Sequence, residues 1–202
     1  MNASPFARVG RFAVVVLAAI GLASCGINSV PAAEENAKAK WADVEAAFQE
    51  RANLLQNLPE IVAAAGEREQ DILTQVVDAR ARATSVNIAA SDLDDPMAME
   101  SFAQAQGELS AGIGRLLVAV EAYPELQSIV NYQMLQSQLE GQENRIRIAI
   151  RDYNDAVREY NTTIRTFPDV IGAKVIHGAD PMVPYSAVTP GAETAESLEG
   201  RL

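Results

Sequence analysis

Apolar residues recur at steps of three and four along most of the chain, which predicts helices that each bury one face. A first series begins near Glu34 and continues toward Ala89, with Trp41 as its largest member. A second helix is predicted from about Met97 to Ala122, and a third between Pro124 and Pro168. The pattern therefore predicts an all-α protein with three to four long helices.

The first apolar series is interrupted by Pro59, with Gly66 following it. Proline removes a helical hydrogen bond and crowds the preceding turn. A single helix from Glu34 to Ala89 would be roughly 80 Å long, far longer than its neighbours. We therefore expect a kink or break near residues 58–66, although the unbroken apolar series also fits a continuous helix.

Two charged residues, Arg51 and Glu69, occupy positions at which the rest of this series is apolar. Helical periodicity turns both toward other helices, and an unpaired buried charge is costly. Each is therefore expected to have a partner of opposite charge. The candidates are Glu140 or Glu143 for Arg51, and Arg115 or an arginine between residues 145 and 151 for Glu69.

The third helix carries the densest group of polar side chains, including two Tyr-Asn pairs seven residues apart. One interpretation is a binding groove or an acid/base pair. The other is an interior seam in which Glu143–Arg147 and Arg151–Asp155 pair at i, i+4 and tyrosine hydroxyls bond to neighbouring backbone. The candidate interior polar network comprises Arg51, Glu69, Glu121, Glu143, Arg147, Arg151, Tyr153, Asn154, Tyr160 and Asn161.

Candidate catalytic and metal-binding groups are scarce. The chain has one histidine, His177, and one cysteine, Cys25. A zinc or di-iron site built from histidine and cysteine, or a nucleophile–histidine triad, therefore finds no support. We expect no catalytic residue, no metal and no cofactor. The net charge of −11 also argues against nucleic acid as a partner.

The N-terminus resembles a bacterial lipoprotein signal. Arg8 and Arg11 precede an apolar run at residues 12–23, which is too short to span a bilayer comfortably. The run ends in Leu-Ala-Ser-Cys at residues 22–25, similar to a lipobox. We expect residues 1–24 to be a signal peptide, Cys25 to be lipidated and residues 25–33 to form a spacer. An uncleaved anchor and an ordinary signal peptide remain the alternatives.

Three motifs resemble the LemA family. They are ENRIRIAIRDYNDAVREYNTTIRTFP at 143–168, EAYPEL at 121–126 with the following Asn131-Tyr132 and Leu135, and RANLLQNLPEIV at 51–62. The resemblance covers about residues 36–187. It implies an up-and-down antiparallel bundle, usually of four helices, tethered to a bacterial membrane near its N-terminus and without established enzyme activity.

Two departures from the family pattern bear on the fold and the anchor. Gln56 stands where the family usually has proline, so the break is expected about one turn later, near Pro59. Many members carry a transmembrane helix, whereas this chain has a lipobox-like motif. The bundle is expected over residues 34–178. A Pro/Thr/Glu-rich tail follows at 179–202, with little packed structure apart from Met182 to Tyr185.

Two functions fit these observations. The first is a non-catalytic interaction or scaffolding module in the bacterial cell envelope, facing the periplasm, held at the membrane by a lipid anchor and bound to a protein partner. The second is an envelope ligand-binding or hydrolytic protein that uses the Glu/Arg/Tyr cluster between helices. A deep pocket lined by that cluster would favour the second function, and a filled core the first.

Overall fold

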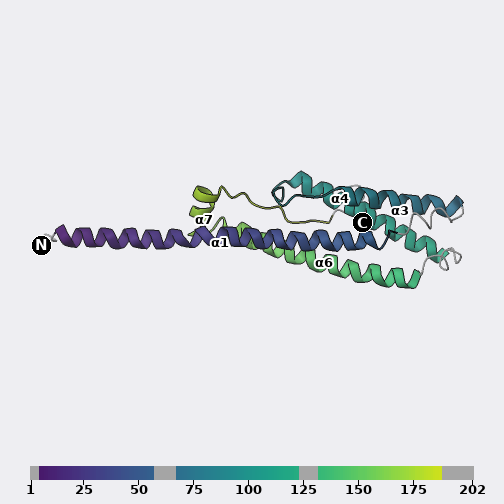
Figure 1. The fold of residues 1–202 in the computed structure, drawn as a ribbon, viewed down its shortest axis with the longest axis horizontal. Helices are drawn as coiled ribbons and strands as arrows, with labels where there is room; N and C mark the ends of the chain where they lie inside the picture. The colour runs from purple at the N-terminus through teal and green to yellow at the C-terminus, as the bar shows by residue number, and fades with distance from the viewer. Residues whose placement is uncertain (1–4, 57–66, 123–131, 188–202) are drawn as a thin grey trace, which may run out of the picture.

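The computed structural model describes residues 5–56, 67–122 and 132–187, and their side chains over 28–56, 70–119 and 134–187 (Figure 1). This part of the chain contains helices and no strand. The helices are α1 (Pro5–Asn53), α3 (Glu67–Ser85), α4 (Pro96–Ala122), α6 (Tyr132–Thr163), α7 (Asp169–Gly172) and the π-helix η1 (Ala173–His177). The predicted all-α class is confirmed.

The four long helices form an up-and-down antiparallel bundle. Successive helices reverse direction, so that α1 and α4 run one way and α3 and α6 return (Figure 1). The closest packing lies within two helix pairs, α1 with α6 and α3 with α4. The arrangement expected from the family resemblance is therefore present.

The first apolar series is divided between two helices. α1 ends at Asn53, and hydrogen bonds from Leu55 N–H to Ala52 C=O and from Gln56 N–H to Asn53 C=O tighten the chain after it. α3 begins at Glu67. Residues 57–66, which hold nearly all of the expected kink or break, lie outside the described part of the chain. The series does not form one continuous helix, because α3 returns antiparallel to α1 (Figure 1).

An aromatic cluster fills the core toward one end of the bundle. The buried ring of Trp41 on α1 meets Phe102 on α4 and Tyr153 on α6 edge to face, with centroids 5.2 and 5.0 Å apart. A second cluster, centred on leucines such as Leu73 and Leu109, joins α3 to α4. These two clusters fix the pairwise packing of the helices.

The N-terminal spacer expected at residues 25–33 is helical in the structure. α1 begins at Pro5 and continues through Pro31, and Val30 is fully buried. The Ser29 Oγ donates a hydrogen bond of 2.5 Å to the Asp169 Oδ1 on α7. Packing against α7 therefore extends the bundle several residues before Glu34. No helix in the described part of the chain is long and apolar enough to cross a membrane.

The chain beyond η1 returns along the bundle as an extended segment, residues 179–187, here called the strap. It begins after Gly178, whose φ of +58° suits glycine at a helix end. Met182 and Tyr185 are buried, as expected for this short part of the tail. The Val183 N–H donates a 2.8 Å hydrogen bond to Leu93 C=O in the α3–α4 connection. Residues 188–202 lie outside the described part of the chain.

Candidate functional site

The two Tyr-Asn pairs of α6 hold the strap by its backbone. Tyr160 Oη donates to Asp180 C=O at 3.0 Å. The Asn161 side chain donates to Met182 C=O at 2.8 Å and accepts from Met182 N–H at 2.9 Å. One side-chain amide thus satisfies both backbone groups of Met182, as a neighbouring strand would.

The second pair repeats this arrangement three strap residues later. Tyr153 Oη donates to Val183 C=O at 2.8 Å. Asn154 donates to Tyr185 C=O at 2.9 Å and accepts from Tyr185 N–H at 2.8 Å. The strap therefore runs antiparallel to α6, with each Tyr-Asn pair binding one three-residue unit.

The two repeats match in length. Seven helical residues advance about 10.5 Å, and three extended residues advance about 10 Å. Pro181 and Pro184 occupy the middle position of each strap unit, where no N–H donor is needed. The expectation that tyrosine hydroxyls bond to neighbouring backbone is confirmed. The role of the asparagines was missed, although the seven-residue and three-residue repeats are both visible in the sequence.

Burial controls the titration of these tyrosines. It raises the pKa of Tyr153 far above its usual value and that of Tyr185 to about 12. Both phenols consequently stay protonated at pH 10, where an ordinary tyrosine is half ionised. For Tyr153 this preserves the O–H that donates to Val183.

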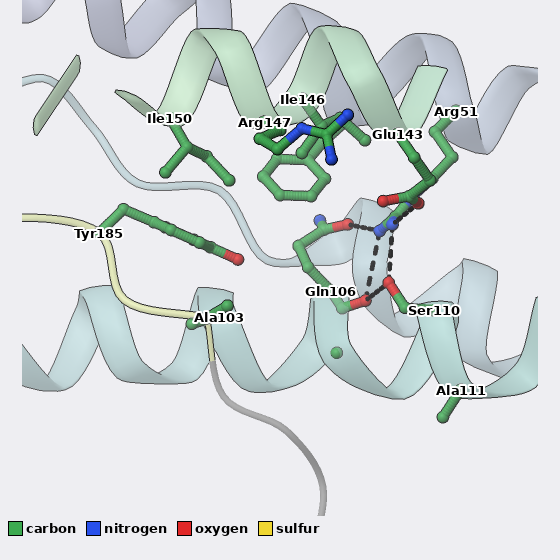
Figure 2. Close-up of a pocket in the computed structure, with 13 residues that line it drawn as sticks. Arg51, Ala103, Gln106, Ser110, Ala111, Glu143, Ile146, Arg147, Ile150 and Tyr185 are labelled. Atoms are coloured by element: carbon green, nitrogen blue, oxygen red, sulfur yellow. Dashed lines mark hydrogen bonds and ion pairs between the residues drawn. The ribbon is translucent and has the colours of Figure 1, made fainter. Parts of the chain in front are cut away.

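Arg51 is the centre of a second polar group. Its side chain is 1% exposed, and its Nη1 donates to Glu143 Oε1 at 2.8 Å and to Ser110 Oγ at 2.7 Å (Figure 2). Its Nη2 donates to the backbone and side-chain oxygens of Gln106 at 3.2 and 3.0 Å. The Arg51–Glu143 pair is one of the two pairings expected from the sequence.

The Arg51 group links all four long helices. Gln106 on α4 donates from Nε2 to Ala83 C=O on α3 at 3.1 Å, while its own oxygens accept from Arg51 on α1. Glu143 completes the connection from α6, with a side chain that is 55% exposed. The guanidinium carbon also lies 5.0 Å from the centre of the Phe48 ring.

The remaining residues of the predicted network do not join this group. Arg147 and Arg151 are exposed and contact Asn144 at 2.8 Å and Asp152 at 3.3 Å, respectively. Asp155 pairs with Arg158 at 2.5 Å. The two i, i+4 pairs expected on this helix are thus replaced: Glu143 turns to the buried Arg51 instead of Arg147, and Asp155 pairs with Arg158 instead of Arg151. Glu69 and Glu121 lie on α3 and α4, and their side chains are outside the described set.

A groove of about 530 Å³ opens between α4 and α6, with α1 along its floor (Figure 2). Its apolar lining includes Phe48, Ala103, Ile146 and Ile150. Its polar lining includes Arg51, Gln106, Ser110, Glu143, Arg147 and Tyr185. The strap closes one end, where the hydroxyl of Tyr185 points into the groove toward Gln106.

The described residues that line the groove include several hydrogen-bonding groups. Glu143 is the one carboxylate among its lining residues, and it is bound to Arg51. His177 does not line the groove; it is exposed at the end of η1. Among the described residues, no group of three or more potential ligands gathers where a metal ion could bind.

We expect Arg51 and Glu143 to be energetically coupled. Glu143→Gln should lower the free energy of unfolding by about 1–2 kcal/mol, because Arg51 stays buried but loses the negative charge that balances its own. In an Arg51→Met background the same change should cost close to nothing. A double-mutant cycle from urea unfolding measures the coupling. Additive single effects would contradict it, and Arg151→Gln serves as an exposed control on the same helix.

We expect Asn161→Ala to release the strap. The change removes both hydrogen bonds to Met182 and should cost about 1–3 kcal/mol. Amide hydrogen exchange should accelerate at residues 182–185 more than in α3. Asn144→Ala is the matched control, since Asn144 lies on the same helix and its side chain bonds to Arg147 rather than to the strap. Equal exchange in both variants would show that the Tyr-Asn pairs do not hold the strap.

Comparison with known proteins gives two kinds of match. The model of the LemA family matches residues 40–196. Magnetosome proteins MamQ 1 and MamQ 2 of Paramagnetospirillum magneticum strain AMB-1 are each 27% identical over 145 residues, covering 64% of this chain and 53% of each relative. The matched region thus spans about half the length of these relatives. Because the family model covers most of the bundle and the strap, the chain belongs to the LemA family.

Proposed function

We propose that this protein is a membrane-tethered, non-catalytic helical bundle that acts as an interaction or scaffolding module in the bacterial cell envelope, facing the periplasm. The observation that carries the proposal is the course of α1, which continues past one end of the bundle toward the N-terminus (Figure 1). This part of α1 contains the apolar run and Cys25. A tether there leaves the long sides of the bundle accessible to a protein partner.

The use of the interior polar groups supports a non-catalytic role. Arg51 is committed to oxygens of Glu143, Gln106 and Ser110. The buried Tyr153 and Tyr160 donate to the strap backbone. These side chains therefore stabilise the fold. The two matched relatives are named for a cellular structure, the magnetosome, rather than for a reaction, which agrees with this proposal.

We expect Cys25→Ser to move the protein from the membrane to the soluble fraction. The substitution removes the sulfur that lipidation would use, while the described side chains of the bundle stay unchanged. Cell fractionation together with metabolic palmitate labelling measures both effects. Ser24→Ala is the control, because it keeps a small residue before the cysteine. A Cys25→Ser chain that stays membrane-bound and unchanged in mass would contradict lipidation and favour an uncleaved anchor.

The groove gives the second candidate function, an envelope ligand-binding or hydrolytic protein, one specific observation in its favour. Arg51, Glu143 and Arg147 of the Glu/Arg/Tyr cluster line it, and Tyr185 joins them from the strap. Apolar walls with a few convergent polar groups are typical of small-molecule sites. Arg147 and the Tyr185 hydroxyl suit a ligand with an apolar body and a hydrogen-bond-accepting end. The single carboxylate favours binding over hydrolysis.

We expect dodecanoate, below its micellar concentration, to shift the methyl NMR signals of Ile146 and Ile150 if this second function is correct. Arg147→Gln should weaken its binding about tenfold, because a charge-assisted hydrogen bond is lost. Arg151→Gln, one turn away and outside the groove, should leave binding unchanged. Unshifted methyl signals, or equal effects of the two substitutions, would count against a ligand site in the groove.

A further inference from the structure

Four large apolar side chains that follow α6 remain exposed in the folded chain. Phe167, Ile171 and Val175 recur at four-residue steps, and Ile176 adjoins them; their exposed fractions are 69, 47, 78 and 56%. We call these four residues the apolar stripe. Three of them lie on α7 and η1, and Phe167 lies just before α7. The four residues fall within ten positions of the chain, and exposed apolar residues that cluster in this way mark a contact with a membrane or a protein.

The stripe is fixed beside the N-terminal part of α1. Asp169 accepts the hydrogen bond from Ser29, and Ala173 is fully buried in the same core cluster as Val30. α7 consequently packs against α1 where α1 leaves the bundle (Figure 1). Ser29 follows Cys25 by four residues, which is roughly 6 Å along a helix. The stripe therefore lies close to the point where the tether would meet the bilayer.

This position favours a lipid surface over other occupants of the stripe. A tether at or before Cys25 holds the adjoining end of the bundle at the bilayer surface, so that nearby apolar groups meet lipid at a very high effective concentration. A short helical segment with apolar side chains can lie in the interface between headgroups and acyl chains. Lys174, exposed within the segment, has a long stem that lets its ammonium group stay at the headgroups.

We propose that the apolar stripe inserts into the outer part of the bilayer as a second membrane contact next to the tether. The inference rests on the proposed tether and holds for a lipid anchor or an uncleaved one. Two contacts on one end of the bundle fix its orientation, with the N-terminal end of α6 directed away from the membrane (Figure 1). One acyl chain or one weak contact alone gives only marginal attachment.

Depth-dependent fluorescence quenching tests the proposal on the full chain in phosphatidylcholine liposomes that contain brominated lipid. Val175→Trp places a reporter in the stripe, and Met134→Trp places one on an exposed position near the start of α6. These positions are separated by most of α6, roughly 40 Å. The indole at position 175 should be quenched several-fold more than the indole at position 134, after subtraction of the signal of the buried Trp41 in the unsubstituted chain. Equal quenching of the two reporters would overturn the inference.

A flotation experiment separates this inference from the proposed tether. In the Cys25→Ser background, combined Ile171→Ser, Val175→Ser and Ile176→Ser changes should reduce residual liposome binding at least tenfold. All three side chains are exposed, so circular dichroism should show an intact bundle.

A chain that floats with liposomes while the reporter at position 175 stays unquenched contradicts the stripe alone. A chain with intact Cys25 that does not float contradicts both tether and stripe. If the stripe stays unquenched, and a protein crosslink formed at it in the unsubstituted chain is lost in the triple variant, the stripe binds a protein partner instead of lipid.

Discussion

The charge of Arg51 is the constraint around which the four long helices are arranged. A guanidinium group buried to 1% exposure destabilises a fold unless oxygens surround it, and the oxygens that bind this one come from helices other than α1. Ser110 and Gln106 come from α4, and Glu143 comes from α6. Gln106 then reaches Ala83 on α3. Each of these hydrogen bonds forms only when its helix lies at the same level along the bundle as Arg51. The group therefore sets how far the helices are shifted relative to one another, and it also balances the buried charge.

α6 has a second structural task, which is to bind the returning C-terminal segment. The strap is not paired with a neighbouring strand, although Val183 N–H bonds to Leu93 C=O, and a buried backbone group without a hydrogen bond is costly. The Tyr-Asn pairs supply the missing bonds at a spacing that an extended chain can follow. Once bound, the strap brings Tyr185 between α4 and α6, where it closes one end of the groove. The Tyr-Asn repeat of α6 therefore both binds the strap and shapes one end of the groove.

The proposed functions use different parts of the molecule. One end gathers the N-terminal part of α1, α7 and the apolar stripe, all of which suit a membrane surface. The long side between α4 and α6 carries the groove, with Arg147 at hand and apolar walls. Its polar residues are occupied by internal bonds or face solvent, and Glu143 is the one carboxylate among its described lining residues. The proposed tether at one end and the proposed recognition along a side are therefore compatible within a single bundle.

The sequence by itself determined the helical class, the family and the need of Arg51 for a polar partner. Periodicity is a local property, so the apolar series revealed the helices, and the burial of Arg51 followed from its place in that series. Its pairing could be narrowed to Glu140 or Glu143 from the sequence, because a buried charge has few possible partners.

Only the tertiary structure decided how these elements meet. It divided the first series between α1 and α3, turned Glu143 toward Arg51 rather than Arg147, and drew residues 28–33 into the packed helix through Val30 and Ser29. It also matched the Tyr-Asn repeat of α6 to the strap. Each outcome depends on contacts between residues far apart in the chain, whose relative free energies are set by burial and geometry in the assembled bundle and leave no local signature.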